Sequence, residues 1–310
     1  MSQTPLNEQQ KNNRLKKIAV TASVSVSASL ALIKLLASLY TGSLAVLSSL
    51  VDSLSDIFSS MITFIAVKFS SQPASEQHRY GYGKAEALSA LIQSAFIAGS
   101  GVFVVYEGIN RFVSPRPVDG AGVGMAVMIA CTLITLGLIA FQKYVVKKTA
   151  SLAVSADSAH YMVDIVTNLS IILGLAVVKI FEIYWFDTLA ALFVSSYLLI
   201  NAYKIAKEAV ALLMDKELPD DVRKEIERLV TECDFCHGIH DLRTRDLGGM
   251  YMFELHLELD GNLSLAEAHD LTDEVEEKLK KHFPNAQVII HQDPAGLKEN
   301  RLDNSLVKKS

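Results

Sequence analysis

Two pairs of ionisable residues recur at a spacing of four inside apolar stretches of the sequence. Asp52 and Asp56 form the first pair, and His160 and Asp164 form the second. Residues four apart lie on one face of a helix, so each pair presents two ligand groups to the same side. Three carboxylates and one imidazole suit a tetrahedral divalent cation such as Zn²⁺, Fe²⁺, Cd²⁺ or Co²⁺. Mg²⁺ and Ca²⁺ fit less well, because they prefer more oxygen ligands.

A proton relay or a structural hydrogen-bond cluster is the alternative interpretation of these four residues. A carboxylate at bilayer depth costs roughly 2.5–3.5 kcal/mol on insertion scales, which favours a compensating cation. Metal ligands bind in their deprotonated form, so an arriving ion should displace protons. His160 is the first candidate to carry such a proton, and an aspartate is the second.

Six apolar segments are long enough to position these pairs across a bilayer, which takes about 20 residues each. Half of the 310 residues are hydrophobic and the mean hydropathy is +0.29, which is high for a wholly soluble protein. We therefore predict a six-helix transmembrane domain over residues 18–208, preceded by a cytoplasmic segment, 1–17. The predicted spans are 18–40, 44–69, 85–112, 122–141, 154–180 and 189–205.

The charges divide the chain into a basic and an acidic part. Residues 1–210 carry 16 Lys/Arg against 12 Asp/Glu, whereas residues 211–310 carry 13 against 22. Basic residues gather in the N-terminal segment, after the second and fourth spans, and after the sixth. The positive-inside rule then predicts that both termini are cytoplasmic. The same distribution argues against a nucleic-acid-binding face and against a disordered chain.

The acidic part has the pattern of a small α+β domain, which we predict over residues 209–294 and before a flexible tail, 295–310. Residues 250–260 alternate between apolar and polar side chains, as a half-buried strand does. A helix beginning near residue 218, a hairpin partner at 241–245, a helix at 264–282 and a strand at 287–291 complete an αββαβ order.

Several motifs in this order resemble the cation diffusion facilitator transporters, over nearly the whole chain. Besides the two intramembrane pairs, the likeness rests on Tyr80-Gly-Tyr-Gly-Lys-Ala-Glu86, His240-Asp-Leu-Arg-Thr-Arg245 and His291-Gln-Asp293. The nearest likeness is to bacterial zinc and ferrous-iron efflux members. The resemblance implies a homodimer in the plasma (inner) membrane, with six helices and a metallochaperone-like cytoplasmic domain in each protomer. It also implies metal export by alternating access, driven by inward proton flow.

The resemblance further implies a cytoplasmic two-metal site near the dimer contact. Its ligands would be His240, His256, His269, His291 and Asp293. Without the resemblance, scattered surface histidines would be the simpler interpretation of these residues. A metal bound there would stabilise the dimer by mass action.

Two further family features match less completely. The family places an Asp and two His in the loop after the second span, where this chain has Ser75, His78 and Tyr82. Glu76 lies nearby, so only a weak loop site of Glu76 and His78 is predicted. Lys84 and Asp215 match a charge interlock between the membrane and cytoplasmic parts. A solvated surface pair is the alternative, worth about 0–1 kcal/mol.

The three cysteines are too few for a disulfide framework. Cys233, Cys236, His237 and His240 could form a compact zinc site, but a helix end followed by a turn is the simpler interpretation. Lys34, inside the first span, could reach the membrane surface or pair with an intramembrane carboxylate.

The predicted function is efflux of Zn²⁺ and/or Fe²⁺, and by the same ligand chemistry Cd²⁺, in exchange for protons. A membrane-anchored metal sensor without transport is the main alternative, and a transporter of organic cations is another. An enzyme is disfavoured, because the soluble part has no nucleophile paired with a base and no nucleotide-phosphate loop. The predicted partners are a second copy of the chain, metal ions, protons and the lipid bilayer, and not nucleic acid.

Overall fold

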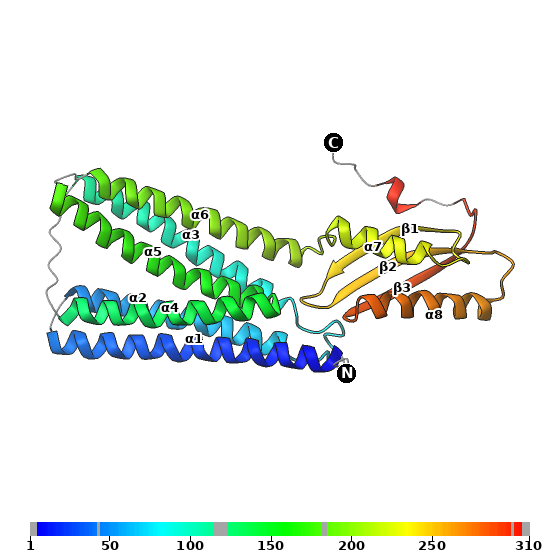
Figure 1. Ribbon diagram of the computed structural model, residues 1–310, viewed down its shortest axis with the longest axis horizontal. Helices are drawn as coiled ribbons and strands as arrows, with labels where there is room; N and C mark the ends of the chain where they lie inside the picture. Colours follow the sequence, from blue (N-terminus) through cyan, green and yellow to red (C-terminus); the bar gives the residue numbers. More distant parts are fainter. Residues whose placement is uncertain (1–4, 42–43, 114–122, 182–184, 299–300, 306–310) are drawn as a thin grey trace. The chain divides into compact units, whose positions relative to one another are not determined.

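The computed structural model describes residues 5–41, 44–113, 123–181, 185–298 and 301–305, and the chain divides into two compact units, Leu6–Val210 and Ala211–Ser310. Long helices make up the described part of the first unit (Figure 1). They are α1 (Pro5–Thr41), α2 (Leu44–Ser70), α3 (Ala85–Val113), α4 (Val123–Thr149), α5 (Leu152–Phe181) and α6 (Trp185–Leu213). Each predicted span lies within one of these helices, apart from Gly122, which falls outside the described residues.

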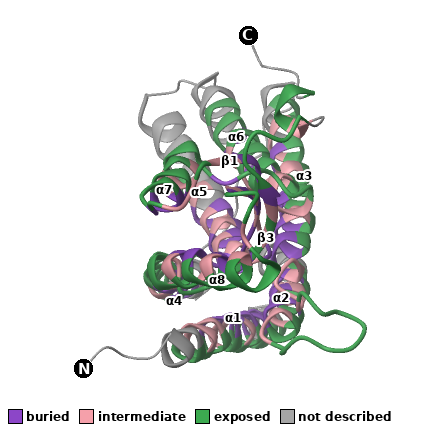
Figure 2. Ribbon diagram, turned by 90° about the vertical axis from the view of Figure 1, so that its right-hand side faces the viewer, coloured by how far each residue is buried: buried purple, intermediate pink, exposed green. Residues whose placement is uncertain are grey.

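The bundle buries polar side chains beside its apolar core and exposes large apolar side chains on its outer surface. Among the described residues, Gln93, Gln142 and Asp157 are fully buried, whereas Phe103 is 63% exposed and Leu133 is 64% exposed. Figure 2 shows buried and exposed positions following different faces of the same helices. Large apolar side chains on an outer surface suit lipid, and polar groups within a membrane must find partners inside the bundle.

Three described stretches are long and apolar enough to cross a membrane by length and composition alone: Gln10–Ala37, Ala85–Tyr106 and Ile129–Thr149.

Close packing joins α3 to α6, where Gly101 lies against Leu199. A Cβ atom on Gly101 would lie 3.2 Å from that leucine, so the missing side chain permits the approach. Small residues at helix contacts play this part in membrane bundles.

In its described residues, the second unit has a three-stranded sheet and two α-helices, in the predicted αββαβ order. Its elements are α7 (Asp220–Thr231), β1 (Gly238–Asp246), β2 (Tyr251–Leu259), α8 (Leu265–His282) and β3 (Ala286–Pro294). The sheet order is β1-β2-β3, with β1 antiparallel and β3 parallel to the central strand. Phe253, Leu255 and Leu257 on β2 pack in one core with Val230 of α7 and Leu279 of α8.

Strands β1 and β3 are longer than predicted, and part of the predicted flexible tail has a defined position. The pairing of β1 with β2 is irregular between His240 and Arg243, and Asp241 has a φ of 51°. A 3₁₀ turn, η1 (Leu302–Asn304), is hydrogen-bonded to Asp241. Residues 299–300 and 306–310 lie outside the described residues. Within the predicted flexible tail, 295–310, Asp241 thus supplies a hydrogen-bond partner for the amides of Leu302 and Asp303.

Candidate metal sites

The intramembrane cluster joins α2 to α5. Asp56 on α2 and His160 and Asp164 on α5 offer ligand atoms that all lie within 4.8 Å of one another. Nε2 of His160 is 3.3 Å from Oδ1 of Asp56. His160 is buried, whereas both aspartates are partly exposed. The side chain of Asp52, the predicted fourth ligand, lies outside the described residues. The structure thus brings three of the four predicted residues together.

A pocket lies beside this cluster. Asp56 and Asp164 line it together with Lys34, Thr135 and Tyr161. Nζ of Lys34 donates to Ser53 Oγ at 2.7 Å, one helical turn from Asp56. Lys34 therefore points into the bundle, as one of its two predicted roles requires.

The donor set and one unused nitrogen fit a bound cation. Nδ1 of His160 is buried without a hydrogen-bond partner in the part of the chain that the structure describes. A buried polar atom of this kind is costly unless a ligand or water satisfies it. One imidazole and two carboxylates at this separation are ligands that zinc-like ions accept.

Asp157, one helical turn before His160, is the centre of a buried polar network that the sequence interpretation missed. Its Oδ2 accepts hydrogen bonds from Ser23 Oγ at 2.6 Å and Gln142 Nε2 at 2.6 Å. Ser60 links Ser23 to the hydroxyl of Tyr161 through contacts of 2.9 and 2.7 Å. The network thus connects α1, α2, α4 and α5 beside the cluster. The sequence does carry a signal for this network, because Asp157 is a fifth ionisable residue inside an apolar segment, besides the two predicted pairs.

The cytoplasmic cluster is built by strand register. His240 of β1 is paired with His256 of β2, which is paired with His291 of β3, so three histidines stand abreast across the sheet. Their neighbouring rings are 4.9 and 4.7 Å apart. Asp293 lies two positions along β3 from His291, on the same face of the strand. Pairing, rather than sequence spacing, brings these side chains together.

Asp293 is the shared partner in this cluster. Its Oδ2 lies 2.7 Å from His256 Nδ1 and 3.5 Å from His240 Nε2, and its Oδ1 lies 3.4 Å from His291 Nε2. His240, His256 and Asp293 offer ligand atoms within 4.8 Å of one another. A carboxylate with histidines on both oxygens can bridge two ions, so the donor set fits the predicted binuclear site.

His269 stands apart from this cluster within the single chain. It lies on the exposed side of α8, and its Nε2 is 3.5 Å from Asp273. The opposite side of α8, with Val275 and Leu279, covers the sheet. A helix cannot present both faces to the sheet, so the membership of His269 in the site stays a prediction.

Among the described residues, no group of three metal-ligating side chains forms at the weak loop site. Ser75 Oγ lies 2.9 Å from the Tyr82 hydroxyl, and the rings of His78 and Tyr82 are 4.5 Å apart. Glu76 is exposed. Lys84 and Asp215 belong to different units, so their pairing stays a prediction, while Asp215 lies 3.8 Å from Arg245 within its own unit.

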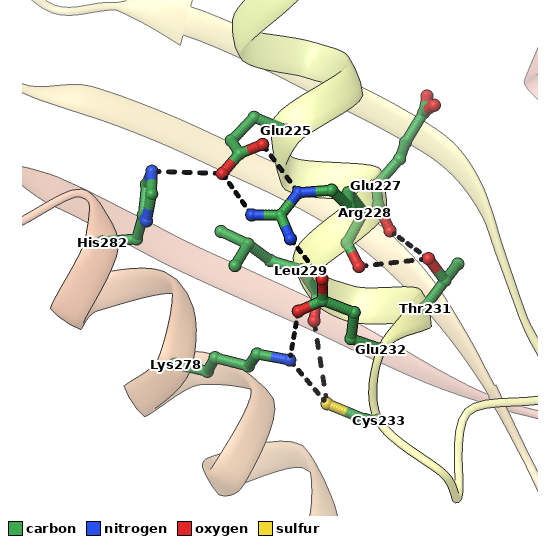
Figure 3. A network of polar contacts seen from close by, with 9 residues as sticks. All are labelled: Glu225, Glu227, Arg228, Leu229, Thr231, Glu232, Cys233, Lys278 and His282. Atoms are coloured by element: carbon green, nitrogen blue, oxygen red, sulfur yellow. Dashed lines mark hydrogen bonds and ion pairs between the residues drawn. The ribbon is translucent and has the colours of Figure 1, made fainter.

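Cys233 takes part in a polar network between α7 and α8 (Figure 3). Lys278 Nζ donates to its Sγ at 3.8 Å and lies 3.3 Å from Glu232. Arg228 joins Glu232 to Glu225, and its guanidinium holds the pKa of Glu225 below the ordinary value. The cysteine therefore belongs to a helix–helix contact, which favours the simpler of the two interpretations.

Comparisons with known proteins cover both units. Residues 20–214 match the family described as the cation efflux transmembrane domain, and residues 218–295 match the cation efflux protein cytoplasmic domain. The cation-efflux pump FieF of Klebsiella pneumoniae is 42% identical over 293 residues, which is 93% of this chain and 96% of that protein. FieF of Escherichia coli O1:K1 / APEC is equally similar, with the same identity and coverage.

Among solved structures, the metal-bound C-terminal domain of the CzcD transporter from Thermotoga maritima matches with a TM-score of 0.25 and 30% identity. That match covers 26% of this chain and 93% of that one.

Proposed function

The chain belongs to the cation efflux family, and we propose that it exports divalent metal cations across the bacterial plasma membrane. The Asp56–His160–Asp164 cluster carries this proposal. It places two carboxylates and an imidazole inside a bundle whose outer surface is apolar. Ionisable groups at that depth are costly and typical of ion pathways.

The proposed substrates are Zn²⁺ and Fe²⁺, with Cd²⁺ acceptable to the same ligands. Imidazole with carboxylates suits these ions better than Mg²⁺ or Ca²⁺. Asp52, four residues before Asp56, would complete a tetrahedral set. Because the ligands bind metal only when deprotonated, protons would compete with the ion for the site. This competition is the physical basis for the proposed exchange of metal against protons, in a homodimer whose termini are cytoplasmic.

The cytoplasmic cluster would have a different role from transport. Its ligands lie in a soluble unit with exposed groups such as His291, where they can sample metal in the cytoplasm. Metal held by His240, His256, His291 and Asp293, with His269, would stabilise the family's dimer contact by mass action.

A sensor that does not transport is disfavoured. Such a protein would need the cytoplasmic cluster but not a metal cluster within the bundle. The relatives named above are called pumps, which also favours transport.

Uptake of metal into proteoliposomes across an imposed proton gradient tests the proposal. Zn²⁺, Cd²⁺, Fe²⁺ and Mn²⁺ should be compared for the wild type and for Asp164→Ala. Gradient-dependent uptake that is lost in the variant is the expected result, and the order of the rates identifies the substrate. Equal uptake in both proteins would contradict the assignment of the cluster. Absence of uptake for every metal, with metal still bound by the cytoplasmic domain, would favour the sensor.

A further inference from the structure

The segment Arg301–Ser305, here called the C-terminal segment, is docked on the edge strand of the cytoplasmic sheet. The carboxylate of Asp241 accepts the amides of Leu302 at 2.9 Å and Asp303 at 3.0 Å. In return, the amide of Asp241 donates to Asp303 Oδ2 at 2.9 Å. Asp241 immediately follows His240 in the metal cluster. The match to the family's cytoplasmic domain ends at residue 295, so the segment lies beyond the shared domain.

A second contact links the C-terminal segment to the cluster itself. Arg301 Nη2 donates to Glu258 Oε1 at 2.5 Å, and the same oxygen lies 3.1 Å from His240 Nδ1. Gly238, paired with Glu258 across the strands, makes room for this carboxylate. A Cβ atom on that glycine would lie only 3.0–3.3 Å from the carboxylate atoms. One oxygen is therefore shared between the segment and a metal-site histidine.

The two sides of the His240 ring face different carboxylates. Nε2 lies 3.5 Å from Asp293, whereas Nδ1 lies 3.1 Å from Glu258 in an ion-pair contact that lacks hydrogen-bond geometry. A carboxylate behind a ligating imidazole orients the ring and raises its basicity, and losing such a group typically costs 10–100-fold in metal affinity. Arg301 donates to the same Glu258 oxygen and brings a positive charge close to the ligands. This positive charge should weaken the binding of a divalent cation.

We propose that the docked C-terminal segment and a metal ion at the cytoplasmic cluster oppose each other. Glu258 acts as a positioning residue for His240, and Arg301 competes for it when the segment is docked. Metal binding releases the segment, and docking of the segment weakens metal binding by the same factor, because linkage is reciprocal. This inference rests on the cytoplasmic metal site of the proposed function.

Hydrogen exchange of the full-length protein in lipid nanodiscs tests the release. Chelator-treated protein is titrated with Zn²⁺ while amides of Leu302 and Asp303, and those of β2 and β3 near His256, are followed. Protection against exchange at Leu302 and Asp303 should fall over the same range of Zn²⁺ concentration in which the exchange of the β2–β3 amides changes. His240→Ala should abolish this effect and so exclude an origin at the intramembrane cluster. Unchanged or increased protection of the segment would overturn the proposal.

The reciprocal effect is measured with Arg301→Gln. This change should lower the Zn²⁺ concentration at the midpoint of the β2–β3 response by roughly fivefold or more, within the usual range of such couplings. Arg301→Lys, which keeps the charge, should stay closer to the wild type. Arg243→Gln is the matched control, because it removes an exposed arginine from β1 without touching Glu258. An unchanged or raised midpoint in Arg301→Gln would contradict the opposition.

Failure of the inference and failure of the metal site give different results. If the β2–β3 amides respond to Zn²⁺ but the segment does not, the site stands and the opposition is refuted. If neither responds, the cytoplasmic site is refuted and the opposition with it.

Discussion

The two metal clusters are assembled by different means, and this difference bears on what each can do. In the bundle, His160 and Asp164 are fixed by the four-residue repeat of one helix, and Asp56 comes from a helix packed against it. In the sheet, His240 and His291 reach His256 only through strand pairing. The first cluster depends on how two helices meet, so helix movement changes its ligand distances. The second depends on strand pairing within one sheet.

Their surroundings differ as well. The bundle cluster adjoins Asp157, a fully buried carboxylate with neutral hydrogen-bond donors. The sheet cluster includes His291, whose side chain is 65% exposed. In the sheet cluster His240 and Asp293 are buried beside this exposed histidine, whereas of the three described residues in the bundle cluster only His160 is buried. The proposed function gives transport to the bundle cluster and metal sensing to the sheet cluster.

The substitution with the largest expected effect on stability should destabilise the cytoplasmic unit and leave the bundle unaffected. Phe253, fully buried and packed edge-on against Phe283, anchors the cytoplasmic core. Phe253→Ala should destabilise that unit by about 3–5 kcal/mol, because the cavity adds to the lost burial. Hydrogen exchange of the β2 amides should measure the loss, while metal uptake at saturating Zn²⁺ persists. The matched change Ile97→Ala, in the bundle core, should spare the β2 amides. If Phe253→Ala loses uptake as completely as Asp164→Ala, the proposed separation of transport from the cytoplasmic unit is contradicted.

A smaller effect is expected at the polar network of the bundle. Asp157→Ala leaves the donors on Ser23 and Gln142 without their buried acceptor, which costs about 1–3 kcal/mol. Asp157→Asn keeps an oxygen acceptor and should lose less. Thermal unfolding of the purified protein, scored by loss of folded material, ranks the two. If both variants match the wild type, the network does not hold the bundle together.

The smallest effect is a pH dependence confined to the cytoplasmic unit. Hydrogen bonds from the side chain and the amide of Ser264 hold the pKa of Glu267 below its ordinary value of 4.5. A lowered pKa stabilises the folded unit above pH 4.5, and that contribution is lost as the pH falls through the folded pKa. In chelator-treated protein, Glu267→Gln should therefore flatten the decline in β2 protection towards acid pH. An identical acid profile in both proteins would contradict this assignment.

Periodicity predicts the helices and the αββαβ order well, because both follow from local patterns. Spacing alone also predicts that His160 and Asp164 share a face. It does not predict that His240, His256 and His291 stand abreast, because register depends on pairing between distant segments. The family resemblance, rather than geometry, supplied that expectation.

Two features escaped prediction for physical reasons. The network around Asp157 joins side chains from four helices, and its members have no common spacing in the sequence. Docking of the C-terminal segment depends on the left-handed conformation of Asp241 and the irregular pairing of β1. Neither leaves a pattern in a polar tail, so the sequence predicts only a flexible tail over 295–310.

The most direct test compares Zn²⁺ transport by Asp56→Ala and Asp293→Ala in proteoliposomes over a range of Zn²⁺ concentrations. The assigned roles predict that Asp56→Ala abolishes uptake at every concentration. They predict that Asp293→Ala keeps a maximal rate near that of the wild type but requires more Zn²⁺ to reach it. The reverse pattern, or equal loss in both variants, would contradict the division between a transport cluster in the bundle and a sensing cluster in the sheet.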